Sequence, residues 1–170
     1  MMKTFVKKQF AKLTEEVIKA HAADILEQLG LSTNNDGILD RIVVSTETGE
    51  NLPLAIMESV TVTQGFFRNN PSYQKGSGQI IIYPCMRYCF ISKKKGFVEM
   101  PIIGLAMLLF RKKLKREMAI DLAHELRHYW QYYTGEKYRN YKYDRMLPYE
   151  HRWEEKDANQ FSYQYVSNNF

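Results

Sequence analysis

The residues most able to do chemistry form one pentapeptide, His124-Glu125-Leu126-Arg127-His128. On an α-helix, side chains four residues apart lie about 40° apart around the axis, one above the other, so the imidazoles of His124 and His128 can reach one metal ion. Glu125 lies about 100° round from His124, where it can reach a water molecule on that ion but not easily the ion itself. This is the general-base geometry of zinc hydrolases, because zinc lowers the pKa of a bound water to about 7.

The helix that must carry this pentapeptide is predicted over residues 117–134, where the pattern is strongly helical and stops before Gly135. One face of this helix is apolar and holds Met118, Ala119, Leu122, Leu126, Tyr129 and Tyr133. His124 and His128 lie almost opposite that face, so they are not core histidines of this helix. The pattern therefore favours a metal-bearing helix over a helix with two ordinary exposed histidines.

A catalytic zinc site needs a third protein ligand and one open position. In one extended pattern a histidine six residues after His128 provides it, but Thr134 stands there. The ligand must come from elsewhere, and a final helix predicted over about residues 150–167 offers several: Glu150, His151, Glu154, Glu155 and Asp157. His151 and Glu155 lie a turn apart on one side of that helix, whereas Glu154 lies closer to its apolar residues.

The two predicted helices resemble those of a known family. The His-Glu-x-x-His motif, followed by Glu-Lys-Asp-Ala-Asn-Gln-Phe at residues 155–161, is similar to the gluzincin arrangement and most closely to the small ImmA/IrrE-type metallopeptidases. The resemblance covers about residues 117–162. It implies that Glu155 is the third zinc ligand, that Ala158 is the small residue three positions later, and that Asn159 holds a ligating histidine through its second ring nitrogen.

Two alternatives for the third ligand stay open. If Glu154 were the ligand, the supporting polar position four residues later would be Ala158, whose side chain accepts no hydrogen bond. His151 would be the ligand in an SprT-like arrangement, although the glycine that usually follows in that family is missing. Arg127 also departs from the resemblance, because many relatives carry a small or polar residue there.

The rest of the chain predicts an α+β domain around these two helices. The spacing of apolar residues predicts an N-terminal amphipathic helix over residues 4–29, ended by Gly30. A small, twisted, mainly antiparallel sheet is then predicted from β-rich runs at 42–44, 54–67, 79–83 and 87–92. After Pro101, residues 102–114 are predicted to be a buried helix or a buried strand, because periodicity does not separate the two.

The composition restricts the class of protein. The 170 residues, 45% hydrophobic and 25% charged, are typical of one folded domain over residues 1–170. Two cysteines, Cys85 and Cys89, are too few for a disulfide scaffold or a zinc ribbon. The longest apolar run, 102–110, is less than half of the roughly 20 residues that a bilayer span needs, and the N-terminus has no signal-peptide pattern. We therefore expect a cytoplasmic protein without a membrane partner.

Together these features predict a minimal zincin-like metallopeptidase that uses Zn²⁺, and an endopeptidase rather than an exopeptidase. Its expected substrate is a protein or peptide, bound in extended form by strand addition at residues 79–83 or 87–92. The oxyanion-stabilising group stays open among Tyr138, Tyr141, Tyr143, Tyr149, His151 and Arg152.

Two other functions remain as alternatives. The first is a zincin-like, non-proteolytic protein that binds a protein partner, or nucleic acid through the basic residues 112–116. The second is a purely structural zinc whose fourth position is closed by His151. The basic run itself is predicted to be a solvated segment that precedes the metal-bearing helix.

Overall fold

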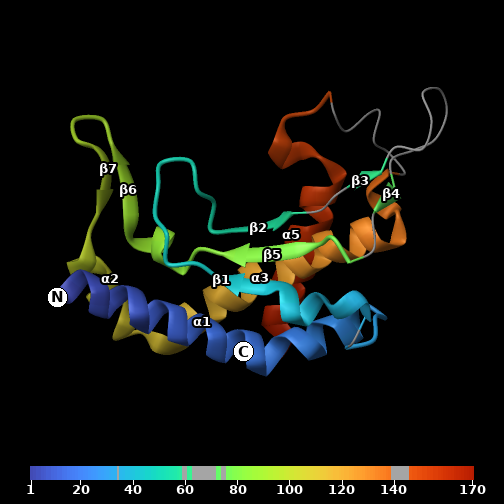
Figure 1. Cartoon of the computed structure of the whole chain (residues 1–170), viewed down its shortest axis with the longest axis horizontal. Coiled ribbons are helices and arrows are strands. Elements are labelled where there is room, and N and C mark those ends of the chain that lie inside the picture. The colour runs from blue at the N-terminus through green and yellow to red at the C-terminus, as the bar shows by residue number, and fades with distance from the viewer. Residues whose placement is uncertain (34, 59–60, 63–71, 74–75, 139–145) are drawn as a thin grey trace.

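The computed structural model describes residues 1–33, 35–58, 61–62, 72–73, 76–138 and 146–170 (Figure 1). They form a mixed structure in which one N-terminal helix, short strands and C-terminal helices follow one another, so the predicted α+β class is confirmed. Within these residues no helix has both the length and the apolar character to cross a lipid bilayer.

Helix α1, Met2–Gln28, runs along one side of the molecule (Figure 1). Its buried face carries Val6, Phe10, Leu13, Val17, Ile25 and Leu26. The helix ends where Gly30 adopts a positive φ of 71°, which lets the Leu31 amide donate a hydrogen bond to the Leu26 carbonyl at 2.9 Å. The predicted helix over residues 4–29 is confirmed, and it begins two residues earlier.

The main sheet has the strand order β1-β5-β2, formed by Ile42–Val44, Gln79–Ile82 and Ala55–Glu58. β5 pairs with β2 in antiparallel and with β1 in parallel orientation; among the described residues three of the four strand pairings are antiparallel, in agreement with the predicted mainly antiparallel arrangement. A parallel pair needs a long connection, and here the chain between β1 and β5 contains β2. β5 is therefore the central strand.

Two further strand pairs are separate from this sheet. β3, Thr61–Val62, pairs with β4, Ser72–Tyr73, while β6, Cys89–Ser92, and β7, Gly96–Glu99, form a hairpin. The strand predicted over 87–92 is thus shorter, because a 3-10 helix, Pro84–Tyr88, precedes it. Residues 59–60 and 63–67 of the predicted run 54–67 lie outside the described residues.

The segment 102–114 is helical on both sides of a corner at residues 109–110, and it is only partly buried. Helix α2, Pro101–Leu108, ends at a corner, and α3, Arg111–Thr134, begins six residues before the predicted start at 117. The first residues of α3 are the basic run itself, which is therefore helical and not a separate solvated segment. Only one face of α2 packs on the domain, where Gly104 lies against α1, and its other face is exposed.

Helix α3 lies at the centre of the fold, in contact with α1, β2 and the C-terminal helix α5, Trp153–Asn169. Its apolar face is fully buried at Met118, Ala119, Leu122, Leu126 and Tyr129, as predicted, while Tyr133 is partly buried. Helices α3 and α5 run antiparallel, because Gln131 contacts Glu154 whereas Arg127, one turn earlier, contacts Asp157. This arrangement brings the first turn of α5 alongside the pentapeptide.

Candidate metal centre

Three predicted ligands converge between α3 and α5. One ligand atom from each of His124, His128 and Glu155 lies within 4.8 Å of the other two. The two Nε2 atoms are 2.9 Å apart, and the Glu155 carboxylate oxygens lie 3.4 Å from Nε2 of His124 and 3.3 Å from Nε2 of His128. Ligand atoms about 2.0–2.1 Å from a tetrahedral zinc would be about 3.3 Å apart. The spacing of these atoms therefore suits one small, tetrahedrally coordinated cation.

Local helix geometry explains this convergence. His124 and His128 are one turn apart on α3, so their rings stand one above the other, with centroids 4.5 Å apart. Glu155 lies in the first turn of α5, where the helix dipole favours a carboxylate. Burial by itself would raise the pKa of Glu155, but the two adjacent imidazoles and the Tyr149 hydroxyl hold that pKa far below its usual range. The carboxylate is thus ionised, as a metal ligand must be.

Gln131 fixes the orientation of the His128 ring. Its side-chain nitrogen donates hydrogen bonds to Asp157 Oδ2 at 2.7 Å and to the Glu154 carbonyl at 3.0 Å, so its oxygen faces Nδ1 of His128, 2.9 Å away. An amide oxygen only accepts hydrogen bonds, so Nδ1 must carry the proton. The lone pair of Nε2 then points into the cluster, which is the tautomer that a metal ligand requires.

Arg127 holds Asp157 in place. Its guanidinium donates to both carboxylate oxygens, at 2.7 Å and 2.9 Å, and lies 3.9 Å from the centre of the Trp130 ring. A two-pronged pair of this kind fixes both position and angle. The departure from the family pattern at Arg127 therefore has a structural role, since it joins α3 to α5 beside the cluster. Sequence reasoning missed this role and that of Gln131, although Gln131 lies at the i+3 spacing from His128 that puts two side chains in contact.

The structure does not bring the other predicted residues into the cluster. Asn159 is exposed and lines a cavity beside His124, and no hydrogen bond joins its side chain to either histidine in the described part of the chain. The supporting contact expected of Asn159 is made to His128 by Gln131. His151 is exposed in the 3-10 helix Tyr149–His151, and Glu154 is buried next to the cluster but is not one of its members.

Glu125 is buried between two cavities that flank the cluster. The first has a volume of about 260 Å³ and is also lined by His128 and Glu155, and the second, about 350 Å³, is also lined by His124 and Asp121. Burial raises the pKa of Glu125. A carboxylate in this position, with a raised pKa and access to both cavities, is suited to accept and release a proton.

Strand β2 forms the opposite wall of both cavities. Pro53 and residues 55–57 line the first cavity, and Leu54 and Ala55 line the second. Within the described residues β2 pairs only with β5, so its other edge is not covered by a strand. The prediction that residues 79–83 or 87–92 bind the substrate along a strand edge was wrong. Residues 79–82 form the central strand of the sheet, and β6 lines neither cavity.

Of the residues considered for oxyanion stabilisation, Tyr149 and Arg152 line the 260 Å³ cavity together with Glu125. Tyr149 is 60% exposed as a whole, but desolvation of its hydroxyl and a hydrogen bond to Glu155 raise its pKa, so the hydroxyl keeps its proton and can donate it in a hydrogen bond. The side chains of Tyr138, Tyr141 and Tyr143 lie outside the described part of the chain.

Comparisons of the chain with protein-family models, with curated proteins and with solved structures found no match.

Proposed function

We propose that this chain is a zinc-dependent metallopeptidase with a minimal zincin-like fold, formed as one domain over residues 1–170. The observation that carries this proposal is the spacing of the His124, His128 and Glu155 ligand atoms, within 4.8 Å of one another and beside two cavities. Two neutral imidazoles and one carboxylate are a known donor set of catalytic zinc, in which a fourth position stays open. The resemblance to gluzincins points to the same three residues.

The residues around the cluster have distinct roles in this proposal. Zinc, when bound, acts as a Lewis acid and lowers the pKa of a water molecule to about 7. The Glu125 carboxylate takes a proton from the attacking water and returns it to the leaving amine. The Tyr149 hydroxyl donates a hydrogen bond to the carbonyl oxygen of the substrate as negative charge develops there.

The substrate class follows from the wall opposite the cluster. An extended peptide can add as a strand to the uncovered edge of β2, where backbone hydrogen bonds give affinity without requiring a particular sequence. Such a peptide would pass the cluster through both flanking cavities. We therefore favour cleavage within a chain over removal of terminal residues.

Metal analysis and a peptide-cleavage assay test this function together. The wild type should bind one equivalent of zinc and cleave a mixture of unstructured peptides. Glu125→Gln should keep the metal and lose about 10²–10⁴-fold in kcat, because only proton transfer is removed. Glu155→Ala should lose the metal, whereas His151→Ala, the control, should keep both metal and activity.

The outcomes separate the alternatives. A protein that binds no zinc would end the proposal. Zinc binding without cleavage by the wild type would favour the non-proteolytic binding function, and loss of metal in His151→Ala would favour a structural zinc.

A further inference from the structure

Helix α2 exposes a row of large apolar side chains. Ile102, Leu105 and Leu109 recur at helical spacing along its outer face, and Phe110 follows at the corner with α3. Ile102 is 71%, Leu109 81% and Phe110 69% exposed to solvent. A folded monomer rarely exposes a continuous apolar row of this kind, which therefore marks an interaction surface.

Basic residues border this row. Arg111, Lys112, Lys113 and Arg116 are exposed, and none of them forms an ion pair within the part of the chain that the structure describes. They occupy the first turns of α3, which has no acidic residue in its first turn. The helix dipole adds partial positive charge at the same end. We call these four residues, together with the apolar row, the α2–α3 corner.

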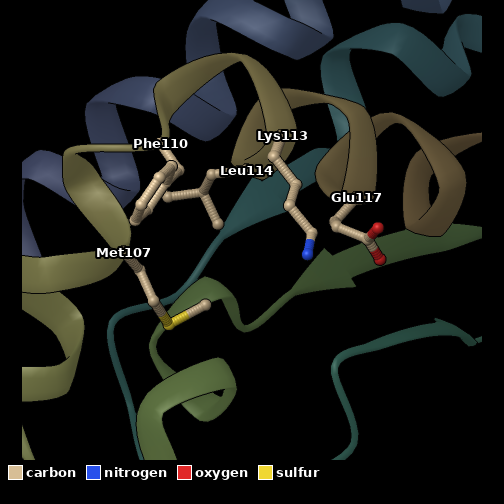
Figure 2. Close-up of a pocket in the computed structure, with 5 residues that line it drawn as sticks. All are labelled: Met107, Phe110, Lys113, Leu114 and Glu117. Atoms are coloured by element: carbon tan, nitrogen blue, oxygen red, sulfur yellow. The ribbon is translucent and has the colours of Figure 1, made fainter.

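A cavity of about 360 Å³ opens at the corner (Figure 2). Figure 2 shows Met107, Phe110 and Leu114 along one part of its lining, with the Lys113 ammonium and the Glu117 carboxylate further along. The cavity is therefore apolar at its Met107 end and carries one charge of each sign near Lys113 and Glu117. Protruding apolar side chains, an apolar hollow and a basic border occur together at this corner.

We propose that the α2–α3 corner binds the surface of an anionic lipid bilayer. Ile102, Leu109 and Phe110 enter the boundary between headgroups and acyl chains, and the basic residues contact the anionic headgroups. A second copy of the chain fits this surface less well, because a symmetric contact would bring two basic borders together. Binding to a bilayer surface differs from the sequence-based expectation of no membrane partner, because that expectation rested on the absence of a membrane-spanning segment.

The corner and the metal centre lie apart on the same helix. His124 follows Lys113 by eleven residues, which corresponds to about 16 Å along α3 at a rise of about 1.5 Å per residue. The side chains proposed to enter the bilayer, Ile102, Leu109 and Phe110, line neither cavity beside β2, so their contact leaves both cavities accessible. The proposal does not depend on peptidase activity.

Co-sedimentation of the full chain with vesicles tests the proposal. The chain should bind vesicles of phosphatidylcholine mixed with phosphatidylglycerol, should not bind phosphatidylcholine alone, and should be released as salt screens the charges. The double variant Lys112→Glu/Lys113→Glu should lower the apparent affinity by at least about tenfold. Leu109→Gln/Phe110→Gln should lower it to a similar extent, because the apolar contact is lost.

Matched controls lie elsewhere on the surface. Lys19→Glu and Met146→Gln change an exposed charge and an exposed apolar side chain outside the corner, and both should bind like the wild type. Circular dichroism should show that every variant is folded. Absence of binding to the mixed vesicles, equal binding to both kinds, or unchanged binding of the corner variants would overturn the proposal. So would a dimer that Leu109→Gln/Phe110→Gln dissociates, or binding to polyglutamate but not to vesicles.

Discussion

At the scale of one residue, a substitution of Gln131 tests whether its contact orients the His128 ring in the candidate metal centre. In Gln131→Ala the proton on Nδ1 of His128 loses its acceptor and Asp157 loses a donor, so the ring is free to turn or to change tautomer. We expect zinc affinity to fall by about 10–100-fold. Competition with a fluorescent zinc chelator measures this change.

The control for this experiment is Gln160→Ala, which removes the same kind of side chain from an exposed position on α5. Its zinc affinity should equal that of the wild type. If Gln131→Ala binds zinc within twofold of the wild type, the contact to His128 does not orient the ring.

The proximity of His124 and His128 could be predicted from the sequence, because helix periodicity alone puts one ring above the other. Glu155 could be ranked first only through the resemblance, since Glu154 and His151 are neighbours with similar chemistry. The roles of Gln131 and Asp157 could not be predicted, because they depend on how α3 and α5 face each other. The spacing of residues within one helix does not predict which residues of two different helices lie opposite each other.

At the scale of elements, Gly104 decides how closely α2 can pack on the domain. A Cβ at this position would lie 2.6 Å from Cγ1 of Val6 and 3.0 Å from the Tyr88 ring. Valine is stiff at χ1 and Tyr88 is fully buried, so neither can yield easily. The better helix propensity of alanine, about 1 kcal/mol, is therefore outweighed by overpacking. Gly104→Ala should lower the free energy of unfolding by about 1–2 kcal/mol in urea denaturation.

Gly49→Ala provides the matched control, because a Cβ there meets only Leu52 at an ordinary contact distance of 3.6 Å. Its unfolding free energy should stay within about 0.5 kcal/mol of the wild type. A stability of Gly104→Ala equal to or above that of the wild type would show that α2 can move away from α1 without cost.

The same helix shows why residues 102–114 were difficult to predict. An apolar run is usually a sign of burial, and here it is half exposed because α1 and the 3-10 helix before β6 cover only one side of α2. The start of α3 was predicted too late because apolar spacing was used as the signal. Arg and Lys are good helix formers, so residues 111–116 can be helical without an apolar face.

At the scale of the whole molecule, the first and last helices are joined by a polar contact. The Tyr165 hydroxyl of α5 donates to Asp24 at 2.8 Å and lies 3.0 Å from Nδ1 of His21, both on α1. The His21 ring also stacks on the C-terminal Phe170, with ring centroids 4.9 Å apart. Since Tyr165 donates its proton to Asp24, its oxygen accepts the proton of His21, which suits a neutral imidazole. This contact joins the C-terminal half of α5 to α1, whereas α5 packs directly on α3 around Glu155.

The protonation of His21 therefore links pH to the stability of the whole fold. Burial lowers the pKa of His21 below its usual 6.5, and the nearby Asp24 only partly opposes this shift. Between the two pKa values the unfolded chain binds more protons than the folded one. The contribution of His21 to the free energy of unfolding is therefore complete above about pH 6.5 and is lost as the pH falls.

Melting curves at pH 7.5 and 5.5 test this prediction. The decrease in Tm between pH 7.5 and pH 5.5 should be larger for the wild type than for His21→Gln. The candidate metal cluster should contribute equally to both proteins, because Tyr165, which His21 contacts, follows Glu155 by ten residues, about 15 Å along α5. The difference between the two proteins therefore isolates His21. The exposed His151, changed to Gln, is the control and should reproduce the wild-type decrease. An equal decrease in the wild type and His21→Gln would show that this contact does not couple protonation to folding.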